Sequence, residues 1–125
     1  MPYVYLQGMA HDLQFDPDRP DVWIWLQAWY VAQCDGDWEH GHGITITTLD
    51  NPGWHVTIDL TDTGVAPEAY TRREVRRSED DWCITWTENA TFQAACGPAN
   101  LAEAIHEFRL WTTSQAQGSF IVDGS

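Results

Sequence analysis

Apolar residues between positions 21 and 34 recur every three or four residues, which is the period of an α-helix. Pro20 and Asp21 are typical of a helix start, and Gly36 stands where a left-handed C-cap ends a helix. The pattern therefore predicts a helix over 21–34 with one buried face. That face is formed by Val22, Trp25, Leu26, Trp29, Tyr30 and Gln33.

From Gly43 onward the period changes to two, which is the period of a β-strand. Isoleucine alternates with threonine in residues 43–49, and apolar and polar residues alternate again in residues 54–60. The DNPG sequence between these segments is typical of a turn, so together they predict a hairpin. Residues 69–77, AYTRREVRR, are interpreted as a third strand or a short helix.

A second hairpin is predicted over residues 82–96, and a final helix over residues 97–111. In the hairpin we expect Trp82, Ile84, Trp86, Phe92 and Ala94 to point inward, and Cys83, Thr85, Thr87, Gln93 and Ala95 to point outward. In the helix, Asn100 and Glu103 have the spacing of a capping box. Its apolar face contains Leu101, Ala104, Ile105, Phe108 and Trp111.

The order of elements predicts an α+β fold, in which an antiparallel meander sheet of about five strands has an N-terminal and a C-terminal helix packed on one face. A length of 125 residues fits a single domain over 1–125 with its core in 21–111. The N-terminal arm, 1–19, and the tail, 115–125, are interpreted as extras. We expect the opposite sheet face to meet water, because it is rich in threonine: Thr45, Thr47, Thr57, Thr85 and Thr87.

Charge narrows the possible partners. The formal net charge is −13, and the six basic residues are all arginines. Such a field argues against nucleic acid and anionic membranes as direct ligands, and it favours a basic partner or serves solubility alone. Residues 71–77, TRREVRR, are interpreted as edge-strand charges. No membrane span or secretory signal is visible, so we expect a cytoplasmic protein.

Residues 33–44, QCDGDWEHGHGI, gather the densest candidate chemistry. Zinc sites draw ligands from separated chain segments, but His11, His55 and His106 are isolated. An EF-hand loop is excluded because its sixth position would be His40 and its twelfth Ile46. The sequence therefore predicts neither a metal site nor a cofactor, and the three cysteines, Cys34, Cys83 and Cys96, are interpreted as small hydrophobic residues.

The aspartates and glycines of this segment are typical of a junction between a helix and a strand. Glu39 and His40 are not explained in this way, and beside Asp37 they have the groups needed for acid–base chemistry. No nucleophile elbow or P-loop accompanies them. The residues permit catalysis without specifying a reaction.

Two long segments, WYVAQCDGDWEHGHGITITTLDNPGWHVTIDL (29–60) and DDWCITWTENATFQAACGPANLAEAIHEF (80–108), resemble the immunity protein 53 family of bacterial polymorphic toxin systems. The resemblance covers residues 21–111. It implies a small cytosolic protein that binds and neutralises a cognate toxin, which we expect to be basic. We expect the partner-binding residues to surround the DGDWEH box (residues 35–40): Asp35, Asp37, Trp38, Glu39, His40 and Trp54.

Two alternatives remain open at this point. The first is a small-molecule enzyme of a biosynthetic pathway, with a pocket lined by Trp25, Trp29, Trp38 or Trp54. Its acid–base groups would be Asp37, Glu39, His40 or His42. The second is a homodimer formed through the threonine-rich face or a terminal strand. A deep pocket lined by these tryptophans, with a carboxylate inside, favours the enzyme, and a flat acidic face counts against it.

Overall fold

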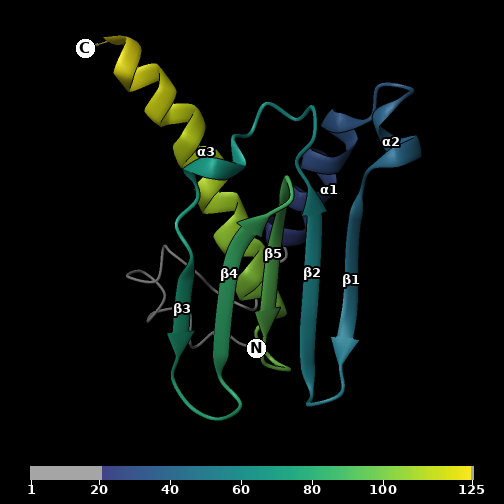
Figure 1. The fold of residues 1–125 in the computed structure, drawn as a ribbon, viewed down its shortest axis with the longest axis vertical. Helices are drawn as coiled ribbons and strands as arrows, with labels where there is room; N and C mark the ends of the chain where they lie inside the picture. Colours follow the sequence, from purple (N-terminus) through teal and green to yellow (C-terminus); the bar gives the residue numbers. More distant parts are fainter. Residues whose placement is uncertain (1–20, 125) are drawn as a thin grey trace.

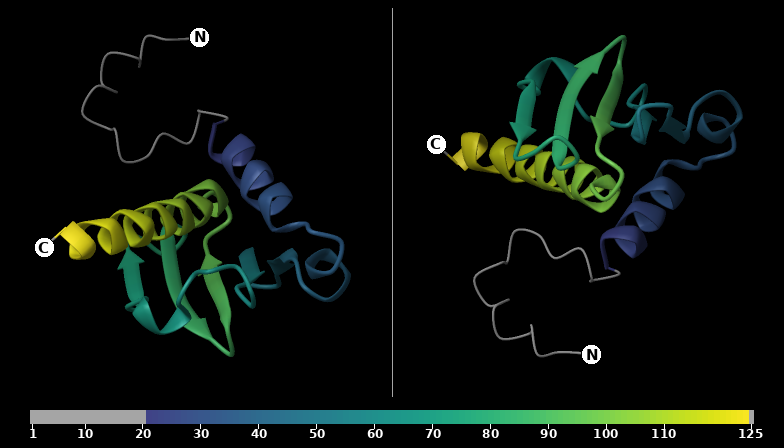
Figure 2. Two further views of the ribbon diagram at one scale, coloured as in Figure 1. Left: turned by 90° about the horizontal axis from the view of Figure 1, so that it is seen from above. Right: turned by 90° about the horizontal axis from the view of Figure 1, so that it is seen from below.

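The computed structural model describes residues 21–124, with side chains as far as residue 115, and packs two long helices on one face of a five-stranded sheet (Figure 1). Figure 2 shows both helices on the same side of the sheet. This arrangement confirms the predicted α+β class. The elements are α1 (Asp21–Gln33), α2 (Trp38–Gly41), β1 (Ile44–Leu49), β2 (Gly53–Asp59), the 3-10 helix η2 (Pro67–Ala69), β3 (Arg73–Arg76), β4 (Trp82–Glu88), β5 (Thr91–Cys96) and α3 (Leu101–Gly124).

Both ends of the chain were interpreted as extras. The predicted N-terminal arm, 1–19, lies outside the described residues. The backbone of residues 115–124 continues α3 as helix and projects past the sheet in Figure 1. In the described part of the chain, no helix combines the length and apolarity that crossing a membrane requires.

The sheet is antiparallel, but its strand order is β1-β2-β5-β4-β3, so the predicted meander is wrong. After β2, residues 60–72 carry the chain across one end of the sheet to the far edge (Figure 1). The chain then returns through β4, and β5 pairs with β2. This order places the most apolar strands in the middle, where Val56, Ile58, Phe92 and Ala94 are fully buried.

The side of β4 that was predicted to point outward is the side that packs against the helices. The turn between β4 and β5 is formed by Asn89 and Ala90, both with positive φ, which is the geometry of a two-residue type I′ hairpin. This turn sets Glu88 opposite Thr91, so even-numbered residues of β4 share a face with odd-numbered residues of β5. The prediction that Trp82, Ile84 and Trp86 point inward is therefore wrong. All three lie on the sheet face that is turned away from the helices.

The residues of β4 on the helix side are Cys83, Thr85 and Thr87. Cys83 and Thr85 are buried there, and Tyr70 hydrogen-bonds to the hydroxyl of Thr85. A face with Thr85 and Thr87 exposed to water is thus not formed. The exposed threonines of the other face lie in β1, where Thr45 and Thr47 are both exposed.

The helices bury the faces that their periodicity predicts. Phe108 of α3 is fully buried. Its ring lies edge-to-face with those of Trp25 and Trp29, with ring centres 5.8 Å and 5.1 Å apart respectively. At the start of α3, the side-chain amide of Asn100 donates to the Glu103 carboxylate at 3.0 Å and to Asp81 at 2.9 Å. The two residues therefore interact, but through their side chains. The backbone hydrogen bonds of the predicted capping box are not formed, and the side-chain oxygen of Asn100 is buried without a partner.

The three thiols differ in their access to solvent. Cys83 and Cys96 are buried, and burial raises the pKa of Cys83 to about 12 and that of Cys96 to about 11. Cys34 is half-buried, and its thiol donates to the carbonyl of Tyr30 at 3.3 Å. Since thiolates are the reactive form, we expect a single fast reaction with a disulfide reagent at about pH 8. The replacement Cys34→Ser should abolish this phase, and a second fast thiol would contradict the packing.

Candidate functional site

The DGDWEH box forms a turn between α1 and β1 that is braced by its own carboxylates. One oxygen of Asp35 accepts hydrogen bonds from the backbone N–H groups of Asp37, at 2.9 Å, and Trp38, at 3.0 Å. The carboxylate of Glu39 reaches back to the N–H groups of Asp35, at 3.0 Å, and Gly36, at 2.9 Å. The bonds from Trp38 and Asp37 hold the pKa of Asp35 below its ordinary value. The loop is therefore fixed by its own side chains.

Glu39 belongs to the turn, contrary to the interpretation that the turn does not require it. Both of its carboxylate oxygens accept backbone hydrogen bonds, so the turn fixes the orientation of this side chain. The sequence contains a signal for this role: a glutamate three residues after the left-handed Gly36 has the spacing of half a capping box. Within residues 21–115, the side chains that project from the box without a hydrogen bond are Asp37 and His40, both exposed.

Trp38 lies beneath the box rather than on its surface. Only 4% of the residue is exposed, and its indole N–H donates to the carbonyl of Thr61 at 2.8 Å. Its ring packs edge-to-face against the rings of Trp29 and Tyr30, with ring centres 6.1 Å and 5.9 Å apart respectively. The side chain has no exposed face with which to anchor a partner.

Trp54 lies at the other end of the sheet from the box. It is the second residue of β2, whereas the box adjoins Asp59, the last residue of that strand. Its indole N–H donates to the carbonyl of Pro98 at 3.0 Å. The structure thus gathers Asp35, Asp37, Glu39 and His40 in one loop and leaves Trp54 apart.

His42 forms a pair with Asp59, a residue not included among the predicted site residues. The Nδ1 atom of His42 lies 2.8 Å from Oδ2 of Asp59, and the other carboxylate oxygen accepts the backbone N–H of Thr61 at 2.9 Å. Burial favours the protonated acid, but the hydrogen bonds from Thr61 and His42 outweigh it and lower the pKa of Asp59. The hairpin register, which places Gly43 opposite Asp59, is the signal that brings this pair together.

His42 is one of the residues that line a shallow groove of about 490 Å³ between α1 and β1. The groove is mostly apolar, and its lining includes Trp23, Leu26, Tyr30 and Ile44. The tryptophans proposed for an enzyme pocket are placed differently, since Trp25 and Trp29 pack on Phe108 and Trp38 is buried.

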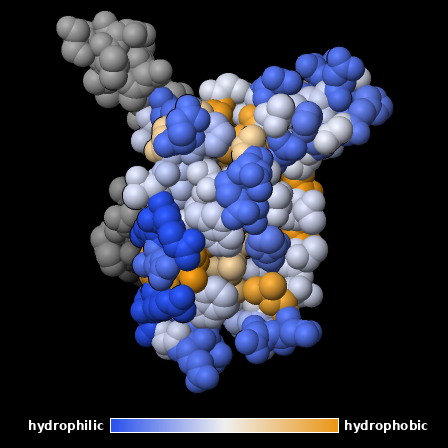
Figure 3. Space-filling model, in the orientation of Figure 1, coloured by the Kyte–Doolittle hydropathy of each residue, from blue (hydrophilic) through white to orange (hydrophobic). Residues whose placement is uncertain are grey.

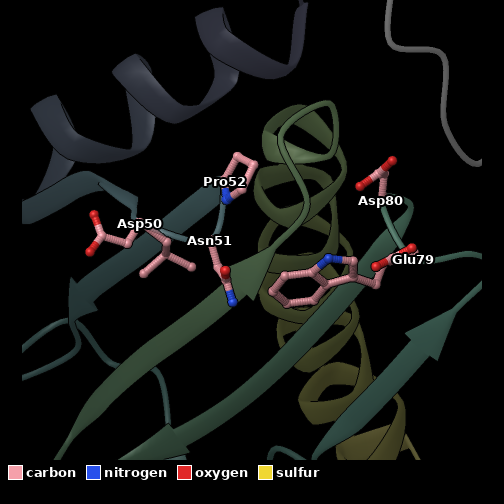
Figure 4. A pocket seen from close by; sticks show the side chains of 7 residues that line it. Asp50, Asn51, Pro52, Glu79 and Asp80 are labelled. Carbon is pink, nitrogen blue, oxygen red and sulfur yellow. The ribbon is translucent and has the colours of Figure 1, made fainter.

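A second groove, of about 650 Å³, opens at the end of the sheet opposite the box (Figure 4). Figure 4 shows Asp50 and Asn51, from the turn after β1, across from Glu79 and Asp80, from the turn before β4. Sequence reasoning missed it because the two turns become neighbours only through the strand order. Next to this groove, Asp81 forms an ion pair with Arg77 at 3.0 Å.

The described side chains contain no group of three histidine, cysteine or acidic residues arranged to hold a metal ion. Among known families, the one described as Immunity protein 53 matches residues 23–113. Neither the curated proteins nor the solved structures include a significant match. The family match spans α1 from its third residue onward, the box, all five strands and α3 as far as residue 113. By this match over most of its length, the chain belongs to the immunity protein 53 family.

Proposed function

We propose that this immunity protein neutralises a cognate bacterial toxin by binding a basic surface of that toxin through the DGDWEH box. Family membership supports a toxin as the kind of partner, and the net charge of −13 favours a basic one. The single observation that carries the placement is the bracing of the loop. Asp35 and Glu39 hold the backbone in place, while Asp37 and His40 stay exposed.

A braced acidic loop suits an inhibitor for two physical reasons. A loop that is already ordered loses little conformational entropy when a partner binds, so more of the contact energy appears as affinity. Exposed carboxylates also steer a basic partner into encounter and raise the association rate. In this proposal Asp37 and His40 contact the toxin directly, Asp35 and Glu39 supply negative charge while shaping the loop, and Trp38 supports it from below.

The biosynthetic enzyme is less well supported by the same geometry. Glu39 has both oxygens bound to the backbone, and Asp37 is exposed on the surface of the box. A general base works within reach of a bound substrate in a site that limits water. We therefore propose binding rather than catalysis as the function of the box.

The function itself is tested with the protein encoded by the gene next to that of this chain, which the proposal expects to be the toxin. Expression of that toxin alone should arrest bacterial growth, and expression together with this chain should restore it. The purified chain should also form a stable complex with the toxin in size-exclusion chromatography. If neither rescue nor a complex is observed, neutralisation of that toxin is refuted.

The placement on the box is tested by Asp37→Asn, which removes one exposed charge and preserves the size of the side chain. We expect the association rate with the toxin to fall about two- to fivefold at low salt, and the difference to shrink as salt screens the charge. The matched control is Glu68→Gln, which removes one charge from an exposed residue of η2. Stopped-flow fluorescence measures both rates, and equal rates for the two variants would contradict the placement.

A further inference from the structure

Strand β1 is an edge strand of the sheet formed by residues 21–124. It is the outermost strand in Figure 1, and within the described residues only β2 pairs with it. Proteins usually protect such an edge with charges, proline or a covering segment. The opposite edge, β3, follows this rule with Arg73, Glu74 and Arg76, whereas β1 has the sequence ITITTL, with no charge and no proline.

The register identifies which backbone groups are available on this edge. Asp59 donates its N–H to the carbonyl of Gly43 at 3.0 Å, so these two residues form a hydrogen-bonded pair of the antiparallel ladder. Such pairs alternate along the strand, so Thr45 and Thr47 bond to β2. The N–H and C=O groups of the residues between them point away from the sheet; these residues are Ile44, Ile46 and Thr48.

The side chains along the edge match an incoming strand with apolar residues at alternate positions. Ile46 is 37% exposed on the helix side of the sheet, and Trp23 of α1 is 38% exposed. The apolar groove between α1 and β1 runs beside the first residue of the strand, Ile44. Alternate side chains of an added strand would therefore lie against Ile46 and the mouth of this groove.

Carboxylates at both ends of β1 indicate the charge of the occupant. Asp35 and Asp37 precede the strand in the box, and Asp50 follows it directly. In Figure 3 the strip over β1, on the right, is pale or orange between hydrophilic groups at its two ends. A second copy of this chain fits poorly, because antiparallel pairing of two β1 strands would bring the box of one copy towards Asp50 of the other. A strand flanked by basic residues fits both ends.

We propose that the toxin adds an extended segment to β1 as a further strand of the sheet, with apolar residues at alternate positions and lysine or arginine on both sides. Main-chain hydrogen bonds to Ile44, Ile46 and Thr48 supply affinity, and the groove and the acidic ends supply specificity. This inference rests on the proposed function, since it names the surface and the form of the same partner.

Amide hydrogen exchange, followed by NMR, tests the pairing on the unaltered protein with the toxin encoded beside its gene as the probe. In the free protein we expect the amides of Ile44, Ile46 and Thr48 to exchange fast and those of Thr45 and Thr47 slowly. In the complex the first three should slow at least about tenfold. A complex in which they stay fast overturns the added strand and leaves the proposed function standing, while absence of any complex removes both. Concentration-dependent protection in the free protein would assign the edge to a second copy instead.

Substitutions supply an independent test. Ile46→Pro removes an outward N–H while leaving the β1–β2 hydrogen bonds in place, and we expect toxin binding to weaken about tenfold or more. Ile46→Val retains the N–H and should bind as the parent does. The matched control is Glu74→Pro, because the register of β3 also directs the N–H of Glu74 outward, on the other edge. Circular dichroism checks the fold of each variant, and equal affinity of folded Ile46→Pro and Glu74→Pro would overturn the proposal.

Discussion

Replacing Trp38 by alanine is expected to lower the free energy of unfolding by about 3–5 kcal/mol, the cost of removing a large buried aromatic side chain. Trp38 is almost fully buried, and its indole N–H satisfies the carbonyl of Thr61. Alanine would leave a cavity beside Trp29 and Tyr30 and would deprive that carbonyl of its donor. Urea unfolding followed by circular dichroism measures the change.

Two neighbouring variants separate packing from surface effects. Trp38→Phe keeps most of the ring but loses the N–H donor, so it should cost less than Trp38→Ala. Asp37→Ala removes an exposed side chain of the box and should change stability by no more than about 0.5 kcal/mol. If Trp38→Ala left stability unchanged and abolished toxin binding, Trp38 would be a contact residue and the buried placement would be wrong.

Replacing Glu39 by alanine is expected to cost about 1–2 kcal/mol, because two backbone N–H groups lose a charged acceptor. The loss should be local, since both groups belong to the turn between α1 and α2. Faster exchange of the Asp35 and Gly36 amides, measured by NMR, should accompany the lower stability. Toxin binding should weaken as well, because the loop would then have to be ordered during association.

Glu39→Gln is the conservative comparison. Its side-chain amide keeps one oxygen acceptor and replaces the other with a donor, so its stability should fall between those of the parent and of Glu39→Ala. Unchanged amide exchange at Asp35 and Gly36 in Glu39→Ala would show that the loop is held by other contacts. In that case the bracing could not be the basis of the inhibitory surface.

Much of the local structure could be predicted from the sequence because its causes are short-range. The spacing of apolar residues in α1 and α3 predicted which faces are buried, and the Asn51-Pro52-Gly53 turn predicted the first hairpin. Periodicity does not reveal a further reason for a glycine at position 53. A Cβ atom there would lie 2.4 Å from the backbone oxygen of Cys96. That contact exists only because β5 lies beside β2.

Within the box, some contacts follow from the local sequence and others only from the tertiary structure. The bonds that Asp35 and Glu39 make to the backbone span at most four residues, so they follow from the local sequence. The burial of Trp38 depends on Thr61, which lies 23 residues further along the chain. A tryptophan between two acids has the pattern of a surface anchor, and only the path of the chain after β2 places it inside.

The sequence by itself determined helix α1, the first part of α3, the two hairpins and the acidic net charge, because each depends on neighbouring residues or on composition. It did not predict the short helix α2 or the continuation of α3 beyond Trp111. The tertiary structure decided that β5 enters the sheet between β2 and β4, and that β4 turns Cys83 and Thr85 inward. It also decided that β1 is an edge strand, between acidic ends, of the sheet that the described residues form. The physical reason is that strand order and facing depend on pairing between distant segments, and alternation along one strand is compatible with either face.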